Sequence, residues 1–253
     1  MAGFMAYESY MICTSPRSGS TLLCNMLAET GVAGNPASYF YRPSLEDWTN
    51  RLGIKAAAAP ERKLIWEIIR AAITKGRGVT PVFGLRQQRP SFGFLCEKLG
   101  VAMPEVSTDR ERMELAFGRT LFIHLTRGDK LEQAVSLIKA QQTGLWHVAT
   151  DGSELERTAP DRRPVYDAGE IARHIETLTA YDTGWLSWFD QEGIAPLRIT
   201  YSELSEAPGE TLRMVLSALG LDTRSADSVQ PRVRKMADKM SQDWIARYNA
   251  ETA

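Results

Sequence analysis

Short apolar runs and amphipathic segments alternate along most of the chain. Mostly apolar runs at residues 9–14 and 120–125, with shorter ones at 81–85 and 196–200, predict buried strands. Between these runs, apolar residues at spacings of three and four predict helices. The helices are expected at residues 19–30, from 44 onward, and at 61–75, 92–99, 129–141, 167–189, 209–219 and 240–249. Strands that alternate with helices predict an α/β fold, with a parallel sheet and helices on both faces.

One long segment, residues 143–165, shows neither the strand nor the helix period. It contains Gly, Pro and mixed charges. An irregular segment of this length predicts a lid or an acceptor-binding loop. The total length of 253 residues suits one α/β unit, so we expect a single domain over residues 1–253.

Composition and charge indicate a globular protein of ordinary make-up. Hydrophobic residues account for 43% and charged residues for 24%, and a formal net charge of −1 gives no indication of a nucleic-acid partner. The cysteines, Cys13, Cys24 and Cys96, are odd in number and widely spaced, which predicts neither a disulfide framework nor a zinc site. No apolar run is long enough for a transmembrane helix, and the first residues lack the features of a signal peptide. We therefore expect a cytoplasmic protein.

Polar and glycine residues follow the first predicted strand directly. The loop Ser15-Pro16-Arg17-Ser18-Gly19-Ser20-Thr21 lies at the carboxyl end of that strand, where ligands of open α/β sheets bind. The helix that follows offers free N–H groups and a positive dipole end. Gly19 permits close approach of the backbone, and Arg17 adds a permanent charge. The loop therefore predicts a phosphate site, with a Ser/Gly-rich turn that merely starts a helix as the alternative.

This loop differs from the usual loop of nucleotide hydrolases, in which Lys-Ser/Thr after the last Gly binds phosphate and magnesium. Here Ser20-Thr21 follows Gly19, and the basic residue stands two positions before it. The second buried run, TLFIHL at 120–125, provides no acidic residue for a metal. A phosphate site without a metal fits these residues better than the alternative, an atypical P-loop small-molecule kinase.

A second set of anion-binding residues follows the strand at 120–125. Arg127 lies just beyond its carboxyl end, and Ser136 lies on the helix that comes next. Since the carboxyl ends of neighbouring parallel strands meet at one edge of a sheet, both residues are expected to face the crevice of the first loop. Two such sites predict a ligand with two separated phosphates.

Taken together, these segments resemble the bacterial trehalose 2-sulfotransferase family. Besides the loop, the resemblance rests on residues 31–40, 83–86, 123–136, 142–146, 185–189, 199–204 and 241–248. It implies a P-loop-like sulfotransferase fold, with 3′-phosphoadenosine 5′-phosphosulfate (PAPS) as donor, 3′-phosphoadenosine 5′-phosphate (PAP) as product and no metal. The implied acceptor is a carbohydrate or a glycolipid-like molecule, and the resemblance is compatible with a homodimer.

The resemblance also implies roles for individual residues. The loop that includes Ser15, Ser18 and Thr21 would bind the 5′-phosphosulfate, with Arg17 near the bridging oxygen, while Arg127 and Ser136 would bind the 3′-phosphate. The basic pair Arg234 and Lys235 would close over the nucleotide, unless this stretch is simply a solvated face. The expected catalytic residues are Arg17, Arg86 and His124, and the expected substrate-binding residues are Ser38, Tyr39 and Trp146.

The general base is not assigned by the resemblance. The family carries a Glu in a Gly-x-Pro-x-Glu-Phe-Phe stretch, and Ser38 stands at that position here. A serine hydroxyl is a poor base, so trehalose as acceptor is in question, and a nucleotide-binding relative that has lost catalysis is a further alternative. His124 has the chemistry of a base at neutral pH, but its place in a buried strand favours a core histidine. The other residues considered are Glu46, Asp47, His147 and His174.

Overall fold

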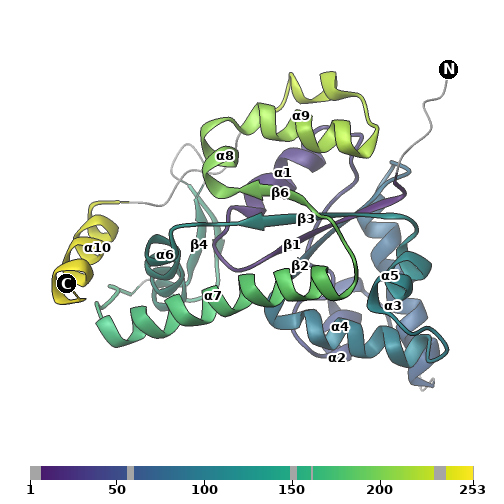
Figure 1. Ribbon diagram of the computed structural model, residues 1–253, viewed down its shortest axis with the longest axis horizontal. Helices are drawn as coiled ribbons and strands as arrows, with labels where there is room; N and C mark the ends of the chain where they lie inside the picture. The colour runs from purple at the N-terminus through teal and green to yellow at the C-terminus, as the bar shows by residue number, and fades with distance from the viewer. Residues whose placement is uncertain (1–6, 56–59, 149–152, 161, 231–237, 253) are drawn as a thin grey trace.

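The computed structural model describes residues 7–55, 60–148, 153–160, 162–230 and 238–252. Within these residues, four strands form a parallel sheet in the order β2-β1-β3-β6 (Figure 1). The strands are β1 (Ser9–Thr14), β2 (Phe83–Gln88), β3 (Thr120–Thr126) and β6 (Leu197–Thr200). The α/β fold with a central parallel sheet is therefore confirmed.

The sheet is covered on both faces, because successive side chains of a strand point to opposite sides. Every residue of β1 is buried. Met11 and Cys13 belong to one hydrophobic cluster, whereas Tyr10 and Ile12 belong to another. A continuous apolar run, rather than an alternating one, is what a strand buried on both faces requires.

Helices of the first half and the long helix α7 cover the face of Met11 (Figure 1). This layer consists of α2 (Leu45–Leu52), α3 (Glu61–Arg77), α4 (Arg89–Ala102), α5 (Asp109–Phe117) and α7 (Ala168–Gln191). Its aromatic rings pack closely, with ring centroids 4.4 Å apart between Phe92 and Trp185 and 4.8 Å apart between Phe92 and Trp188. Trp185 also donates a hydrogen bond of 2.9 Å from Nε1 to the carbonyl of Thr14. The end of β1 is thereby anchored to α7.

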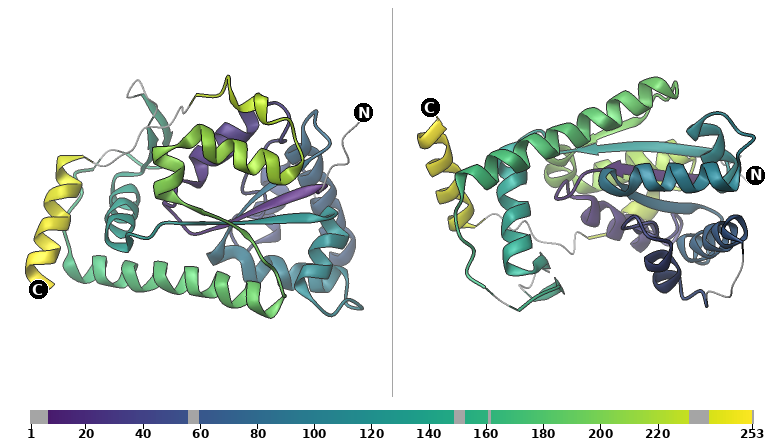
Figure 2. Two further views of the ribbon diagram at one scale, coloured as in Figure 1. Left: turned by 45° about the horizontal axis from the view of Figure 1, so that its top comes forward. Right: turned by 90° about the horizontal axis from the view of Figure 1, so that it is seen from below.

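The opposite face is covered by helices from both ends of the chain (Figure 2). They are α1 (Ser20–Glu29), α8 (Tyr201–Glu206), α9 (Pro208–Leu219) and the short 3₁₀ helix η1 (Thr223–Ala226). A separate apolar cluster joins α6 (Lys130–Thr143) to α7 and to α10 (Lys239–Thr252) through Val135, Ile138, Ile171 and Trp244. This cluster lies beside the sheet, and it supports the helix that follows β3.

Three parts of the chain differ from the sequence prediction. The segment 143–165, expected to be irregular, contains the antiparallel strands β4 (Leu145–Val148) and β5 (Glu154–Arg157). Helix α5 was not predicted because charged residues interrupt its apolar face, and α8 was not predicted because it occupies only six residues. The other predicted helices and strands are present, with ends shifted by a few residues.

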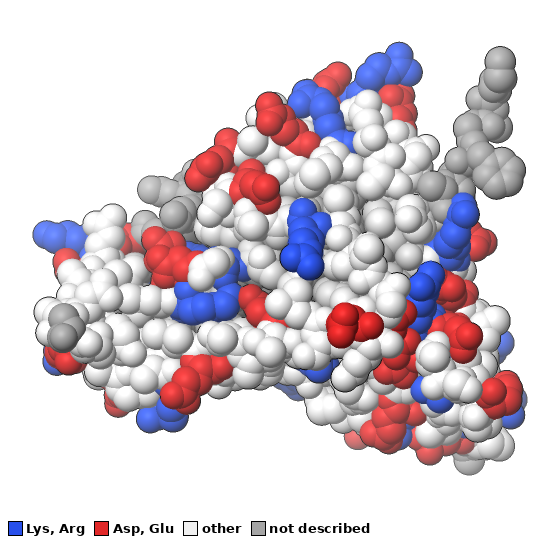
Figure 3. All heavy atoms as spheres, viewed as in Figure 1, with Lys and Arg blue, Asp and Glu red and all other residues white. Residues whose placement is uncertain are grey.

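No helix in the described part of the chain is long and apolar enough to cross a membrane. On the face shown in Figure 3, acidic and basic side chains are interspersed. Positive charge is in excess at the carboxyl ends of the strands, where the cavity described below lies.

The Trp185–Thr14 hydrogen bond can be tested with a matched pair of substitutions. Trp185→Phe removes the donor to Thr14, and we expect it to lower the free energy of unfolding by about 2 kcal/mol more than Trp188→Phe. Trp188 lies in the same aromatic cluster, but its Nε1 has no hydrogen-bond partner among the described residues. Urea unfolding of both variants measures the difference. Equal losses would show that only ring packing, and not the hydrogen bond, holds α7 to the end of β1.

Candidate functional site

A cavity of about 810 Å³ opens at the carboxyl ends of the strands. Its walls come from the loop after β1, the end of β2, the residue after β3, helix α6 and the strand β4. Five arginines line it, Arg17, Arg42, Arg51, Arg86 and Arg127, together with two glutamates, Glu132 and Glu156. The excess of positive charge predicts an anionic ligand.

The loop after β1 is held in a conformation that few residues adopt. Gly19 has a φ of 87° and Arg17 a φ of 62°, both in the left-handed region. Gly19 is the N-cap of α1, and no side chain caps the first turn of this helix. The first-turn N–H groups therefore remain available to an anion, and Gly19, Ser20 and Thr21 all line the cavity.

Glycine is required at position 19 for a second reason. A Cβ atom built there would lie 2.7 Å from Cδ2 of Tyr201, closer than any packed side chain tolerates. The ring of Tyr201 in turn lies beneath the guanidinium of Arg127, with 4.4 Å between Cζ and the ring centroid. Tyr201 therefore connects the loop after β1 with the residue after β3.

Arg17 is half-buried against the wall of the cavity, although it carries a charge. Its Nε donates to Oγ of Ser136 at 3.0 Å, and its Nη1 donates to the carbonyl of Trp146 at 2.6 Å. Burial, and then the nearby charge of Arg127, lower the pKa of Arg17 to about 10. The guanidinium is still protonated at neutral pH, so the cavity keeps a fixed positive charge at the loop.

Arg127 lies next to Arg17, despite the like charge. It is buried, donates from Nη1 to the carbonyl of Arg17 at 3.3 Å and pairs with Glu132 at 2.6 Å. Its Nε has no hydrogen-bond partner among the described residues. A buried donor of this kind is costly unless an acceptor satisfies it, which points to a ligand. The two sets of anion-binding residues, expected from the sequence to face one crevice, thus lie side by side in one wall of the cavity.

A chain of hydrogen bonds crosses from β2 to the β4–β5 hairpin. Arg86 donates from Nε to Oγ of Ser38 at 2.9 Å and from Nη1 to Oγ1 of Thr21 at 2.7 Å. The same Oγ1 lies 3.0 Å from Nε2 of His147. Burial, and then Arg17 and Arg86, lower the pKa of His147 to about 4, so its imidazole is neutral at pH 7.

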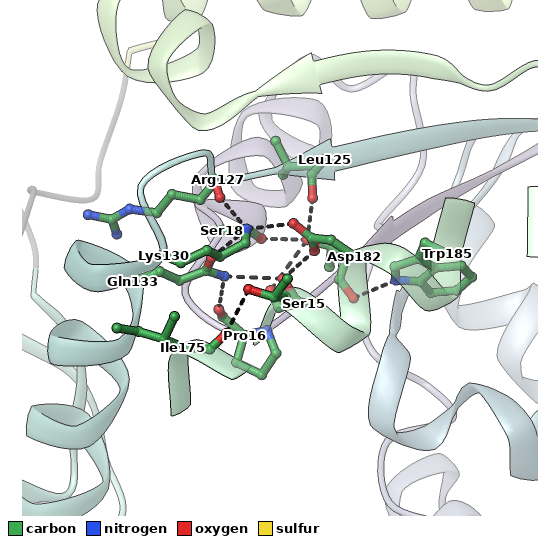
Figure 4. Close-up of polar contacts among 12 residues, drawn as sticks. Ser15, Pro16, Ser18, Leu125, Arg127, Lys130, Gln133, Ile175, Asp182 and Trp185 are labelled. Atoms are coloured by element: carbon green, nitrogen blue, oxygen red, sulfur yellow. Dashed lines mark hydrogen bonds and ion pairs between the residues drawn. The ribbon is translucent and has the colours of Figure 1, made fainter. Parts of the chain in front are cut away.

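A buried polar network fixes the back of the loop (Figure 4). Asp182 on α7 accepts from Oγ of Ser15 at 3.1 Å and pairs with Lys130 at 2.5 Å. Gln133 on α6 donates to Ser15 Oγ at 3.1 Å and to the carbonyl of Pro16 at 2.7 Å. The network joins β1, α6 and α7, and it positions the loop without occupying its cavity face.

The structure brings most of the predicted site residues to the cavity. Those that line it are Arg17, Gly19, Ser20, Thr21, Ser38, Arg86, Arg127, Ser136 and Trp146. Ser15 and Ser18 are buried behind the loop instead, where Ser15 contacts Asp182 and Ser18 contacts Thr14. Arg234 and Lys235 lie outside the described residues.

Two predicted residues do not reach the cavity. His124 is buried within β3 with its ring 5.3 Å from that of Phe189, and burial lowers its pKa. Its place is that of a core histidine, so we assign it no catalytic role. Tyr39 is also buried, and its hydroxyl donates to the carbonyl of Asn35 at 2.6 Å. We therefore do not place it among the ligand-binding residues.

Three residues at the candidate site are missed or undervalued in the sequence. Asp182 lies in the middle of an amphipathic helix, where nothing in the pattern distinguishes it. For His147 the sequence leaves two expectations, a lining residue of the acceptor pocket or a surface histidine, because its strand is not predicted. Tyr201 offered a usable signal, since it directly follows the end of β6, at the edge of the sheet that binds ligands. In the described residues, no group of three or more His, Cys, Asp or Glu side chains is arranged to hold a metal ion.

The parallel sheet, the loop that starts α1 and the paired arginines define an α/β protein with a positively charged cavity at its strand ends, a setting suited to phosphate-like anions. A family model described as Stf0 sulphotransferase matches residues 9–251. The chain is also 31% identical, over 97% of its length and 96% of the relative, to a trehalose 2-sulfotransferase of Mycobacterium tuberculosis (strain ATCC 35801 / TMC 107 / Erdman). A trehalose 2-sulfotransferase of Mycolicibacterium smegmatis (strain ATCC 700084 / mc(2)155) is 30% identical over 96% of this chain and 95% of that protein. The chain belongs to the Stf0 sulphotransferase family, and it is a sulfotransferase.

A comparison of two glycine substitutions can distinguish backbone strain from side-chain collision at position 19. Gly31 has a similar φ of 69°, but a Cβ there would meet no atom within 4 Å. We expect Gly31→Ala to lower the free energy of unfolding by about 1 kcal/mol through left-handed strain alone. Gly19→Ala should cost about 1–3 kcal/mol more, because the ring of Tyr201 must move. Urea unfolding measures the free energy of unfolding of both variants. Equal losses would mean that the ring of Tyr201 moves at little cost and does not hold the loop.

Proposed function

We propose that this sulfotransferase moves a sulfuryl group from PAPS to a hydroxyl group of a carbohydrate acceptor. The observation that carries the proposal is the pair of adjacent arginines in one cavity, with Arg127 bonded to the carbonyl of Arg17. Glu132 pairs with Arg127 and offsets one of the two charges, and a ligand of high negative charge would offset the other and accept from the unsatisfied Nε of Arg127. PAPS carries a phosphosulfate and a separate 3′-phosphate, and this charge matches the wall. The names of the two relatives support a carbohydrate as the acceptor.

The donor would use the wall formed by the loop and α6. The phosphosulfate fits the N-terminus of α1, where Gly19, Ser20 and Thr21 line the cavity. The 3′-phosphate would accept from Arg127, including the Nε that no described residue satisfies, and from Ser136. Arg17 and Ser136 are hydrogen-bonded to each other in the structure. Phosphate oxygens would replace this hydrogen bond, so both side chains would become available to the ligand together.

The proposed reaction needs alignment and charge stabilisation rather than a covalent intermediate. The acceptor oxygen forms a bond to sulfur while the bond from sulfur to the bridging phosphate oxygen breaks. The leaving phosphate gains negative charge, which Arg17 and the first turn of α1 stabilise. Arg86 is held between Ser38 and Thr21, and it would contact the oxygens of the sulfuryl group during its transfer. The hydroxyl proton must pass to a base, and PAP is released.

His147 is the group that we assign as this base. Thr21 Oγ1 already accepts a hydrogen bond from Arg86, so its own proton is free to point to His147 Nε2. That arrangement leaves a lone pair of a neutral imidazole facing a hydroxyl on the donor loop. An acceptor hydroxyl that takes the place of Thr21 would meet the same nitrogen. The cavity also contains two acids. Glu132 pairs with Arg127, and Oε2 of Glu156, whose side chain is half exposed, lies 3.5 Å from Nε2 of His147.

The comparisons lend no support to the kinase alternative. The alternative of an inactive relative rested on Ser38, which stands where the family carries a Glu. Ser38 accepts a hydrogen bond from Arg86, so this position is part of the site as a positioning residue. With His147 as base, the serine is compatible with an active enzyme.

Calorimetric titration with PAP, AMP and magnesium-ATP tests the donor. We expect PAP to bind most tightly and without magnesium, because Arg127 and Ser136 recognise a phosphate that AMP lacks. Arg127→Ala should weaken PAP binding by about 2 kcal/mol, the value of a charged hydrogen bond, and should change AMP binding much less. Preference for magnesium-ATP would overturn the donor assignment. Equal weakening of PAP binding and AMP binding would show that Arg127 does not bind the 3′-phosphate.

The role of His147 predicts a defined dependence on pH. A protonated imidazole cannot accept the hydroxyl proton, so turnover should fall as the pH drops through the pKa of His147. That pKa is about 4 without donor, and the negative charge of the donor should raise it toward the usual 6.5. His147→Gln should lower kcat about 100-fold or more and remove this acid limb, while PAP affinity stays unchanged.

His174→Gln provides the matched control, because that ring bonds the carbonyl of Glu170 on its own helix and Gln141 on α6 rather than the loop. Its kcat and its acid limb should resemble those of the natural protein. If His147→Gln keeps both while PAP still binds, His147 is not the base, although the donor assignment stands.

A further inference from the structure

Beyond Ser38, the cavity wall continues into a cluster of Tyr41, Arg42 and Arg51. Both guanidinium groups lie against the ring of Tyr41, with Cζ of Arg42 at 6.0 Å and Cζ of Arg51 at 5.7 Å from its centroid. Tyr41 itself is exposed to solvent. An exposed aromatic ring that keeps two cations beside a cavity is an arrangement without an obvious role in folding.

The backbone at Arg42 is strained, which marks the cluster independently of its charge. Among the described residues, Arg17 and Arg42 are the two non-glycine residues with a positive φ, and both line the cavity. The φ of Arg42 is 65°, and its carbonyl accepts a hydrogen bond of 2.8 Å from Nε1 of the buried Trp48. Such strain persists where the surrounding structure enforces it, and it concentrates at binding sites. Arg17 lies in the proposed donor loop, and Arg42 indicates a second binding site in the same cavity.

The charge of this cluster is weakly compensated. Arg51 forms no ion pair with any residue that the structure describes, and its carbonyl accepts a hydrogen bond from Lys75, a further cation. Arg42 faces Asp47 at 3.7 Å, beyond hydrogen-bond range, with both side chains largely exposed. Two arginines with one distant carboxylate leave a net positive charge on this part of the wall.

The cluster lies on the acceptor side of the proposed reaction. The donor takes the wall of Arg17, Arg127 and Ser136, whereas Arg86 bonds both Thr21 on the loop and Ser38, three residues before Tyr41. The path from the reacting centre through Ser38 therefore leads to Tyr41, Arg42 and Arg51. A molecule with its hydroxyl at the loop would extend toward these arginines.

We propose that Tyr41, Arg42 and Arg51 form a subsite for an anionic group on the acceptor, so that the substrate is a carbohydrate bearing a phosphate or a carboxylate. This inference rests on the proposed function of the cavity. Arginine presents a planar fork of donors that suits both kinds of group. The ring of Tyr41 orients the two guanidinium groups, and the anion would relieve the repulsion between them.

Acceptor binding to the PAP-loaded protein tests the subsite without requiring turnover. Calorimetry would compare trehalose, trehalose 6-phosphate and a disaccharide that carries a uronic acid. PAP keeps the phosphate of the probe out of the donor wall. We expect the charged sugars to bind about tenfold more tightly than trehalose, the equivalent of one charged hydrogen bond. The preference should diminish as the salt concentration rises, since the arginines are exposed.

Arg51→Gln should remove most of this preference while trehalose and PAP bind as before. Arg224→Gln is the control for net charge, because Arg224 is 85% exposed, pairs with Asp222 and does not line the cavity. It should keep the preference. Equal binding of neutral and charged sugars by the natural protein, or a preference that survives Arg51→Gln, would overturn the subsite. A tenfold preference for only one of the charged sugars would assign the group as phosphate or carboxylate.

The donor proposal is tested separately by PAP binding itself. If PAP does not bind, the function proposed for the cavity fails. The dependence on Arg51 is then measured by titrating trehalose 6-phosphate into the unloaded protein. Loss of that binding in Arg51→Gln, but not in Arg224→Gln, would still support the anion subsite. Unchanged binding would overturn it.

Discussion

The geometry of the site depends on the carboxylate of Asp182. One oxygen accepts from Ser15 at the end of β1, and the other pairs with Lys130, whose Nζ also donates to the carbonyl of Arg127 after β3. A single buried acid on α7 thereby sets the spacing of two neighbouring strand ends. Lys130 further orients Gln133, which bonds the loop from behind. A buried ion pair is a poor source of stability, because desolvation offsets its attraction, but it is well suited to fixing one arrangement.

That arrangement holds the protein in a state that folding alone would not favour. Arg17 and the buried Arg127 lie side by side, Arg17 adopts a left-handed backbone, and a donor of Arg127 has no partner among the described residues. Each feature costs free energy in the isolated protein. A ligand with several negative oxygens would offset the first and the last of these costs, since it neutralises the charges and accepts from the unsatisfied donor. The large core on both faces of the sheet supplies the stability against which this strain is maintained.

Local patterns in the sequence predict the scaffold well and the site only in part. The run at residues 9–14 coincides with β1, because a strand buried on both faces needs continuous apolar residues. The loop and Arg127 line the cavity as expected, since strand ends have a known place in α/β sheets. By contrast, His147 lies on a strand whose pairing with β5 depends on a register with bulges. Asp182 and Arg42 matter through contacts with residues far along the chain or through a backbone angle, and a sequence pattern carries neither. His124 illustrates the reverse error, because a chemically apt residue belongs to the core.

The proposed base and the proposed donor site are electrostatically coupled, and this coupling orders the reaction. Without donor, burial and the charges of Arg17 and Arg86 hold the pKa of His147 to about 4, so the imidazole has little affinity for a proton. A donor that brings negative charge to the same two arginines weakens this effect and makes His147 a stronger base. An acceptor hydroxyl would therefore be activated only when the sulfuryl group is already in place. A carboxylate beside the same arginines would respond in the same direction, because the negative charge of the donor would raise its pKa as well. The two bases differ in the pH range of the response, since an imidazole has an ordinary pKa of about 6.5 and a carboxylate titrates well below it. With an imidazole as the base, the donor therefore shifts the pKa toward neutral pH, where the proton acceptor is most effective.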